Sequence, residues 1–151
     1  MKLLQQEILT KTELTTIASL IAEIESKTLG ELRVNIERKR LWKERKLSLH
    51  EIAMRHFFAL GMNKTKAKTG VLVFINMKER AFHIIADEGI HAKVSQEYWD
   101  NLASLMSQHF KQQKFCEGIC SVLRDIGTVL EKEFPTNDSD TNELSNDVII
   151  S

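Results

Sequence analysis

Several features that would assign this sequence to a familiar class are missing. Its 151 residues include one proline and two cysteines, and no apolar run approaches the length of a membrane span. Cys116 and Cys120 lie four residues apart with no further cysteine or histidine at ligand spacing, so we expect free thiols. Glycine-rich phosphate loops and nucleophile elbows are also absent. No motif therefore identifies a zinc site, a nucleotide site or a hydrolase nucleophile.

An excess of charge of one sign is also lacking, since the sequence contains 21 basic and 21 acidic residues. Four acidic residues follow Pro135 with no lysine or arginine to balance them, so the preceding part carries a net charge of +4 (21 basic minus 17 acidic). This excess is too small for binding by counterion release. We therefore expect no nucleic-acid partner.

The first ten residues lack the apolar central region of a signal peptide, because Gln5, Gln6 and Glu7 interrupt it. With two cysteines and no export signal, the reducing cytoplasm is the expected compartment. We predict a cytoplasmic protein without a membrane span, and we expect a monomer.

The hydrophobic content of 42% is sufficient for one domain with a real core. Pro135 prevents the last helical pattern from continuing, and the residues after it are polar and acidic. The sequence therefore predicts a single domain over residues 1–135 and an acidic, flexible tail over residues 136–151.

The pattern of apolar residues predicts three strands. Residues 71–76 form an unbroken apolar run, which is typical of a central strand covered on both faces. A polar turn separates this run from a second one at 82–87, and together they predict a hairpin. Residues 31–37 alternate between apolar and polar side chains and predict a half-buried strand. Residues 147–150 are a possible fourth strand at a free edge.

Helical patterns surround these strands. Capping boxes at Thr10–Glu13 and Ser48–Glu51 predict helix starts, and apolar stripes after Ser95 and after Lys114 predict two further helices. The helix after Ser48 lies between two predicted strands, so the strands at 31–37 and 71–76 should be parallel. The predicted fold is a three-layer αβα sandwich around a small mixed sheet.

This topology brings three carboxylates to one edge of the sheet. Glu31 begins the first strand, and Asp87 and Glu88 follow the hairpin beside Gly89. Several carboxylate and carbonyl oxygens are the ligands that Ca²⁺ or Mg²⁺ prefers, so these residues are a candidate cation site with His91 as a possible supporting residue. A solvated turn that simply leaves the sheet is the alternative interpretation.

The opposite edge offers a second candidate site, with Glu37, Asn76, Glu79 and Arg80. Ligands of open α/β sheets usually bind beyond the carboxyl ends of the parallel strands, which favours this edge. The two edges therefore compete for the site.

The remaining polar features are less specific. The five histidines show no metal-ligand spacing, and we interpret His56 and His109, which lie on apolar helix faces, as packing residues. Residues 38–46 are strongly basic and contain Trp42, with Glu44 as the one acidic residue. This stretch is either a solvated loop or a contact for nucleic acid or anionic lipid.

Segments 30–34, 70–75, 79–80 and 85–91 match, in their order and spacing, a known pattern. They resemble the TPM-domain family, which is named for thylakoid-lumen, photosystem-repair and acetylcholine-receptor-modulating members. The resemblance implies an αβα sandwich that binds a divalent cation, calcium in particular, and a plant member has been linked to weak acid phosphatase activity. One departure is Ala86, which stands where a glycine is common.

Carried over residue by residue, the family's acidic and glycine positions fall on Glu31, Asp87 and Gly89, with Arg80 in the hairpin. Three hypotheses follow, in this order of preference. The first is a domain that binds Ca²⁺ or Mg²⁺. The second is a protein-interaction module that uses the 38–46 loop and the acidic tail, with an unknown protein partner. The third is a weak, metal-assisted acid phosphatase.

Overall fold

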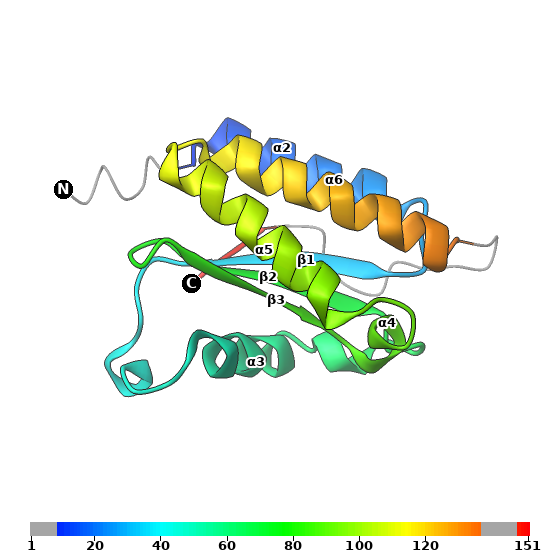
Figure 1. The fold of residues 1–151 in the computed structure, drawn as a ribbon, viewed down its shortest axis with the longest axis horizontal. Helices are drawn as coiled ribbons and strands as arrows, with labels where there is room; N and C mark the ends of the chain where they lie inside the picture. Colours follow the sequence, from blue (N-terminus) through cyan, green and yellow to red (C-terminus); the bar gives the residue numbers. More distant parts are fainter. Residues whose placement is uncertain (1–8, 137–147) are drawn as a thin grey trace.

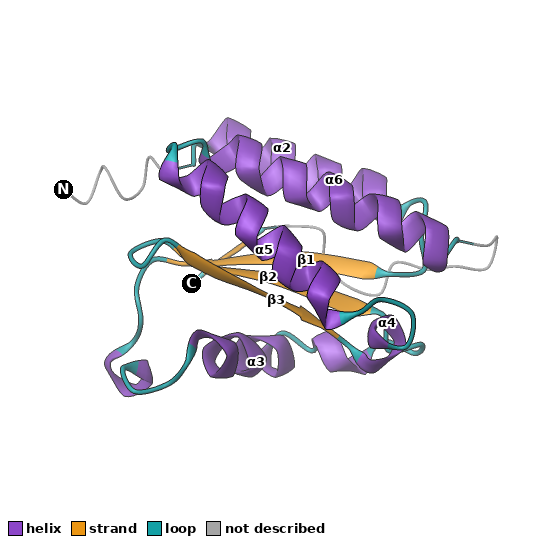
Figure 2. Cartoon of the chain, in the orientation of Figure 1, coloured by secondary structure: helices purple, strands orange, loops and turns teal. Residues whose placement is uncertain are grey.

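The computed structural model describes residues 9–136 and 148–151. A four-stranded mixed sheet separates two helical layers, which is the predicted αβα arrangement (Figures 1 and 2). None of the helices in the described ranges is long and apolar enough to cross a membrane. In chain order the elements are α2 (Lys11–Glu25), β1 (Glu31–Glu37), the 3-10 turn η1 (Trp42–Glu44), α3 (Leu49–Ala59), η2 (Met62–Lys64), β2 (Gly70–Asn76), β3 (Ala81–Ala86), α4 (Glu88–His91), α5 (Gln96–Lys111), α6 (Phe115–Glu133) and β4 (Ile149–Ile150).

The strand order is β3-β2-β1-β4, so β2 is central as its continuous apolar run predicts. Strands β1 and β2 are parallel, with Glu31 opposite Gly70 and Glu37 opposite Asn76. Strand β3 returns antiparallel to β2, and β4 adds to the free edge of β1. Of the possible edge strand at 147–150, residues 149 and 150 form β4, and residue 147 lies outside the described ranges.

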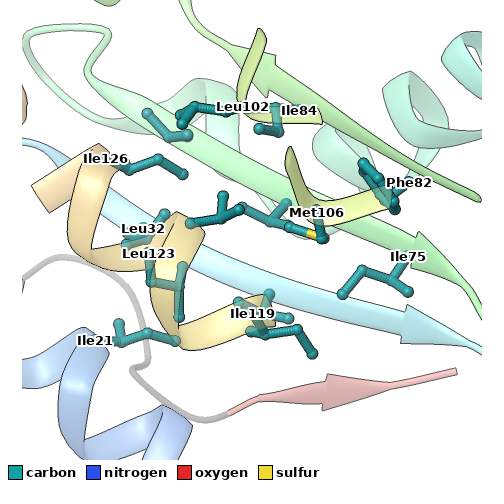
Figure 3. Close-up of a cluster of buried hydrophobic side chains, with 14 of the residues drawn as sticks. Ile21, Leu32, Ile75, Phe82, Ile84, Leu102, Met106, Ile119, Leu123 and Ile126 are labelled. Atoms are coloured by element: carbon teal, nitrogen blue, oxygen red, sulfur yellow. The ribbon is translucent and has the colours of Figure 1, made fainter. Parts of the chain in front are cut away.

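Helices α2, α5 and α6 cover one face of the sheet, and the main core lies between them and the strands. Side chains from the three helices and from β1, β2 and β3 interlock there (Figure 3). Cys120 lies in this core and Cys116 packs against it, and both are free thiols as predicted. Burial of these apolar side chains is the main favourable contribution to folding.

Helix α3 covers the other face with a smaller apolar cluster that includes Ile52, Phe57, Leu72 and Phe74. Its start fits the predicted capping box, since Ser48 Oγ accepts from the Glu51 amide at 3.1 Å and Glu51 accepts from the Ser48 amide at 3.2 Å. The helix turns the 31–76 segment into the βαβ unit that joins β1 to β2. The loop before it, which contains η1, lies at an outer corner of the molecule (Figure 1).

Strand β1 differs from its prediction as a half-buried strand, because all seven of its residues are buried. Leu32, Val34 and Ile36 face the main core, as the alternation predicts. The polar residues between them are also buried, since β1 is an interior strand between β2 and β4 and a second layer covers its other face. A polar row therefore runs along the α3 side of β1 and ends at Glu37.

Candidate functional site

Three side chains converge near the carboxyl end of β1. Glu37 is the last residue of β1, Glu44 ends η1, and His56 lies in α3. Each side chain offers one ligand atom, and these atoms all lie within 4.8 Å of one another. Within residues 9–136 and 148–151, no other group of three or more His, Cys, Asp or Glu side chains meets this condition. We refer to Glu37, Glu44 and His56 as the Glu-Glu-His cluster.

Burial sets the electrostatics of this cluster. Only 3% of the surface of Glu37 and 4% of the surface of Glu44 are exposed to solvent. Burial, followed by the Glu44 carboxylate, raises the pKa of Glu37, and the interaction with His56 opposes this rise. The Oε1 atom of Glu37 accepts no hydrogen bond from the described residues. A divalent cation would supply the positive charge and the missing contact at this atom.

His56 connects the cluster to solvent. Its Nε2 atom lies 3.2 Å from Glu37 Oε2, and its ring packs against Phe74 with the centroids 4.9 Å apart. The His56 side chain keeps 20% of its surface exposed, so it is the most exposed member of the cluster. The ring of His56 packs against a neighbour, as the sequence predicts. Its contact with Glu37 is not predicted from the sequence.

The loop between β1 and α3 fixes the position of Glu44. One Glu44 carboxylate oxygen accepts the Leu41 amide at 2.8 Å, which caps η1. Arg40 donates to the carbonyl oxygens of Glu44, at 3.1 Å, and of Leu47. The same guanidinium pairs with both carboxylate oxygens of Glu79. Arg40 therefore holds the loop against the β2–β3 turn without pairing with a carboxylate of the cluster.

Of the residues predicted for this edge, only Glu37 belongs to the cluster. Asn76 accepts the Glu79 amide at 2.9 Å and stabilises the β2–β3 turn. Glu79 pairs with Arg40, as described above. Arg80 lies over the Phe115 ring, 5.2 Å from its centroid, and so points toward the helical layer of α6. These three residues organise the turn beside the cluster.

The structure also shows where Glu31, Asp87 and Glu88 lie, the three residues of the cation site predicted first from the sequence. Glu31 pairs with Gly70, and the Asp87 amide donates to Gly70 O at 2.9 Å, so both acidic residues occupy the same edge of the sheet. Asp87 Oδ1 accepts the Glu88 amide at 2.8 Å and caps α4. The Glu88 side chain is exposed, and these three carboxylates do not form a close group of the kind found at Glu37. Their role as metal ligands stays a prediction.

The packing of the backbone at this edge explains why residue 89 is a glycine. A Cβ atom there would lie 2.3 Å from Ala67 O and 2.6 Å from Lys68 O, because the loop before β2 crosses directly over it. The Gly89 amide donates to Lys68 O at 2.8 Å. The glycine is therefore required for close backbone approach, whether or not an ion binds nearby.

A cavity of about 720 Å³ lies beside this edge, between α3 and β3. Its lining includes Asp87, Glu88 and His91, so it brings the possible supporting residue close to two of the predicted ligands. His50 and His83 also line it, with His50 Nδ1 and His83 Nε2 2.7 Å apart. Burial and the neighbouring His50 lower the pKa of His83.

The fold and the cluster define a small αβα domain with two carboxylates and an imidazole near the carboxyl end of a parallel strand. The sequence model of the TPM domain matches residues 4–129, so the chain belongs to the TPM-domain family. No curated protein matches the chain.

Solved structures share this fold. The BA42 protein of the psychrophilic bacterium Bizionia argentinensis is 31% identical, with a TM-score of 0.85, and the match covers 95% of each chain. The N-terminal domain of a P. gingivalis protein is 13% identical with a TM-score of 0.70, and covers 84% of this chain and 79% of its own. The N-terminal domain of cg2496 from Corynebacterium glutamicum is 10% identical with a TM-score of 0.63, covering 89% and 81%. The last two similarities concern the fold alone.

Proposed function

We propose that this TPM domain binds a divalent cation through Glu37, Glu44 and His56. The observation that carries the proposal is the convergence of three ligand atoms within 4.8 Å of one another, on side chains of which two are almost fully buried. An ion at this position would offset the negative charge of two carboxylates whose ionised form is disfavoured by burial. The alternative arrangement without an ion requires Glu37 to take up a proton more readily than usual, which agrees with its raised pKa.

The ligand set favours a transition metal over the Ca²⁺ or Mg²⁺ expected from the sequence. Calcium and magnesium prefer oxygen ligands, whereas imidazole suits Zn²⁺ and related ions. Three protein ligands of this kind leave a coordination position for water or a further group. We therefore propose Zn²⁺ as the first ion to test and Mn²⁺, which also accepts carboxylates readily, as the second.

The predicted Ca²⁺ or Mg²⁺ site at Glu31, Asp87 and Glu88 is the second candidate. It is supported by Asp87 Oδ2, which is inaccessible to solvent and accepts no hydrogen bond from the described residues. Its position on the wall of the 720 Å³ cavity adds His91 as a neighbour. An all-oxygen ligand set would suit the harder cations here.

One titration followed by amide NMR separates the two sites. We expect Zn²⁺ to shift resonances of residues 37, 44 and 56, and Glu37→Gln to remove these shifts. Glu97→Gln, an exposed carboxylate on α5, is the matched control and should leave them unchanged. Shifts confined to residues 31 and 87–91, with Zn²⁺ as with Ca²⁺, would transfer the function to the second site. No shift at residue 37, 44 or 56 would refute the proposed cluster.

An acid phosphatase function would require the bound cation to polarise a phosphoryl oxygen. Arg40, which lies in the loop beside the cluster, pairs with Glu79 and is therefore not free to act as a phosphate ligand. Release of phosphate from an aryl phosphate, compared among wild type, Glu37→Gln and Asp87→Ala, tests both edges at once. Activity lost in one variant alone would assign the reaction to that edge.

A further inference from the structure

The loop between β1 and α3 exposes two large apolar side chains in succession. Trp42 keeps 77% of its surface exposed and Leu41 keeps 53%. Trp42 has the highest exposed fraction among the large hydrophobic side chains of the described residues, and its nearest apolar neighbour in the chain is also exposed. The loop that carries them, residues 38–48, forms the cyan corner of the molecule below β1 in Figure 1. This position leaves them free to meet a flat surface.

Basic residues flank this apolar pair in the chain. Arg38, Lys39, Lys43, Arg45 and Lys46 are all exposed, and none of them forms an ion pair with a residue that the structure describes. The sixth basic residue of the stretch, Arg40, turns inward to Glu79 and to the loop carbonyls. Of the six basic residues in this loop, Arg40 therefore has a structural role, and the other five face solvent.

The loop is also held in a defined shape. The buried Glu44 carboxylate caps the Leu41 amide, and the Glu44 amide donates to Leu41 O at 2.8 Å. These contacts anchor the turn immediately beside Trp42. Binding would then cost little ordering entropy in the loop backbone, since its conformation is already fixed.

We propose that residues 38–46 bind the surface of a bilayer rich in anionic phospholipid, with Leu41 and Trp42 entering the interface and the five exposed basic side chains meeting the headgroups. Tryptophan is favoured at membrane interfaces because its ring is amphipathic. Lysine and arginine are attracted to the negative surface potential of anionic lipids. Residues 38–46 combine both features, and they include the anchored turn at Leu41–Glu44. This surface shares the buried Glu44 with the Glu-Glu-His cluster, because the same carboxylate anchors the turn, but none of its exposed residues belongs to that cluster.

The contacts of Trp42 favour a bilayer over a nucleic acid. The Arg45 guanidinium lies over the Trp42 ring, 3.5 Å from its centroid, and so occupies one face on which a base would stack. Leu41 adds an aliphatic side chain that offers a base no stacking surface. An interface between lipid headgroups and acyl chains accommodates the paired ring, its cation and the leucine together.

Cosedimentation with vesicles tests the proposal on the full chain. Equal parts of phosphatidylserine and phosphatidylcholine form the anionic vesicles, phosphatidylcholine alone forms the neutral ones, and EDTA removes any contribution from cations. We expect binding to the anionic vesicles only, weakened by added salt. Lys43→Gln and Lys46→Gln should each lower the partition coefficient by about five-fold. Trp emission should shift to the blue on binding and stay constant in Trp42→Phe, because Trp99 is only 1% exposed.

Matched double variants test the apolar pair. Leu41→Ser with Trp42→Ser should lower the partition coefficient by about ten-fold or more. Phe58→Ser with Leu105→Ser removes side chains that are 53% and 45% exposed elsewhere and should leave it unchanged. Equal loss in both double variants, or binding to neutral vesicles as strong as to anionic ones, would overturn the proposal. So would tighter binding of a single-stranded oligonucleotide, or vesicle binding that begins only after residues 136–151 are removed, since the tail would then be the occupant.

Discussion

Replacing Glu37 by glutamine should stabilise the protein in the absence of metal and remove its stabilisation by metal. The reason is the burial of two carboxylates in one cluster. Two ionised carboxylates whose ligand atoms lie within 4.8 Å of each other would repel, at that limiting distance, by about 3 kcal/mol at an effective dielectric constant of about 20. Glutamine keeps the shape and the oxygen acceptor for His56 and removes this repulsion. The expected gain is smaller than 3 kcal/mol, because Glu37 also attracts His56.

The pH dependence of this gain has a definite sign. The pKa of Glu37 is raised in the folded protein from its usual value of 4.5, so the folded state binds a proton more tightly than the unfolded state does. Wild type therefore loses stability as pH rises from 4.5 through the raised pKa, and the glutamine variant does not. The difference in stability should be full above the raised pKa and should vanish below 4.5, where both side chains are neutral.

Urea unfolding at about pH 8 and at about pH 4 measures both effects. With metal at 100 times its dissociation constant, wild type should gain about 2.7 kcal/mol, and Glu37→Gln should gain nothing. For a chain of this size that gain corresponds to a shift of roughly 5–10 °C in the melting temperature. Glu97→Gln should behave as wild type in all conditions. A glutamine variant less stable than wild type at about pH 8 would refute the electrostatic reasoning.

Three further predictions concern the surrounding structure. The pKa of His83 is lowered from 6.5, so its protonation should destabilise the fold as pH falls below that value, and His83→Gln should reduce this loss in urea titrations at a series of pH values. Gly89→Ala should cost about 1–3 kcal/mol in urea unfolding, because its Cβ would lie 2.3 Å from Ala67 O; an unchanged midpoint would contradict the packing described at this turn. Met106→Ala should cost about 2–5 kcal/mol because Met106 is fully buried between α5 and the sheet (Figure 3), and retention of wild-type stability would show that the core refills the space.

Much of the fold could be predicted from the sequence because each signal was local. The capping boxes at Thr10 and Ser48, the apolar run at 71–76 and the polar hairpin turn each specify one element without reference to the others. The connection between the first two strands then dictated their parallel pairing, which the register confirms. The four-residue helix α4 was not predicted, since so short a segment carries no periodic signal.

The Glu-Glu-His cluster could be predicted only in part. Glu37 was placed at the carboxyl end of its strand by topology, but Glu44 and His56 carry no ligand spacing relative to it. Glu44 reaches the cluster through a single 3-10 turn inside a basic loop, and His56 through the position of α3 relative to the sheet. Both depend on tertiary contacts. The one local hint was that Glu44 is the only acidic residue in residues 38–46.

Calorimetric titration of the metal-free protein with Zn²⁺ tests whether Glu37, Glu44 and His56 together hold one cation. We expect one binding site per chain, with binding lost in Glu37→Gln and in His56→Phe and retained in Glu97→Gln and in Asp87→Asn. Binding that survives Glu37→Gln and His56→Phe but is lost in Asp87→Asn would contradict this expectation.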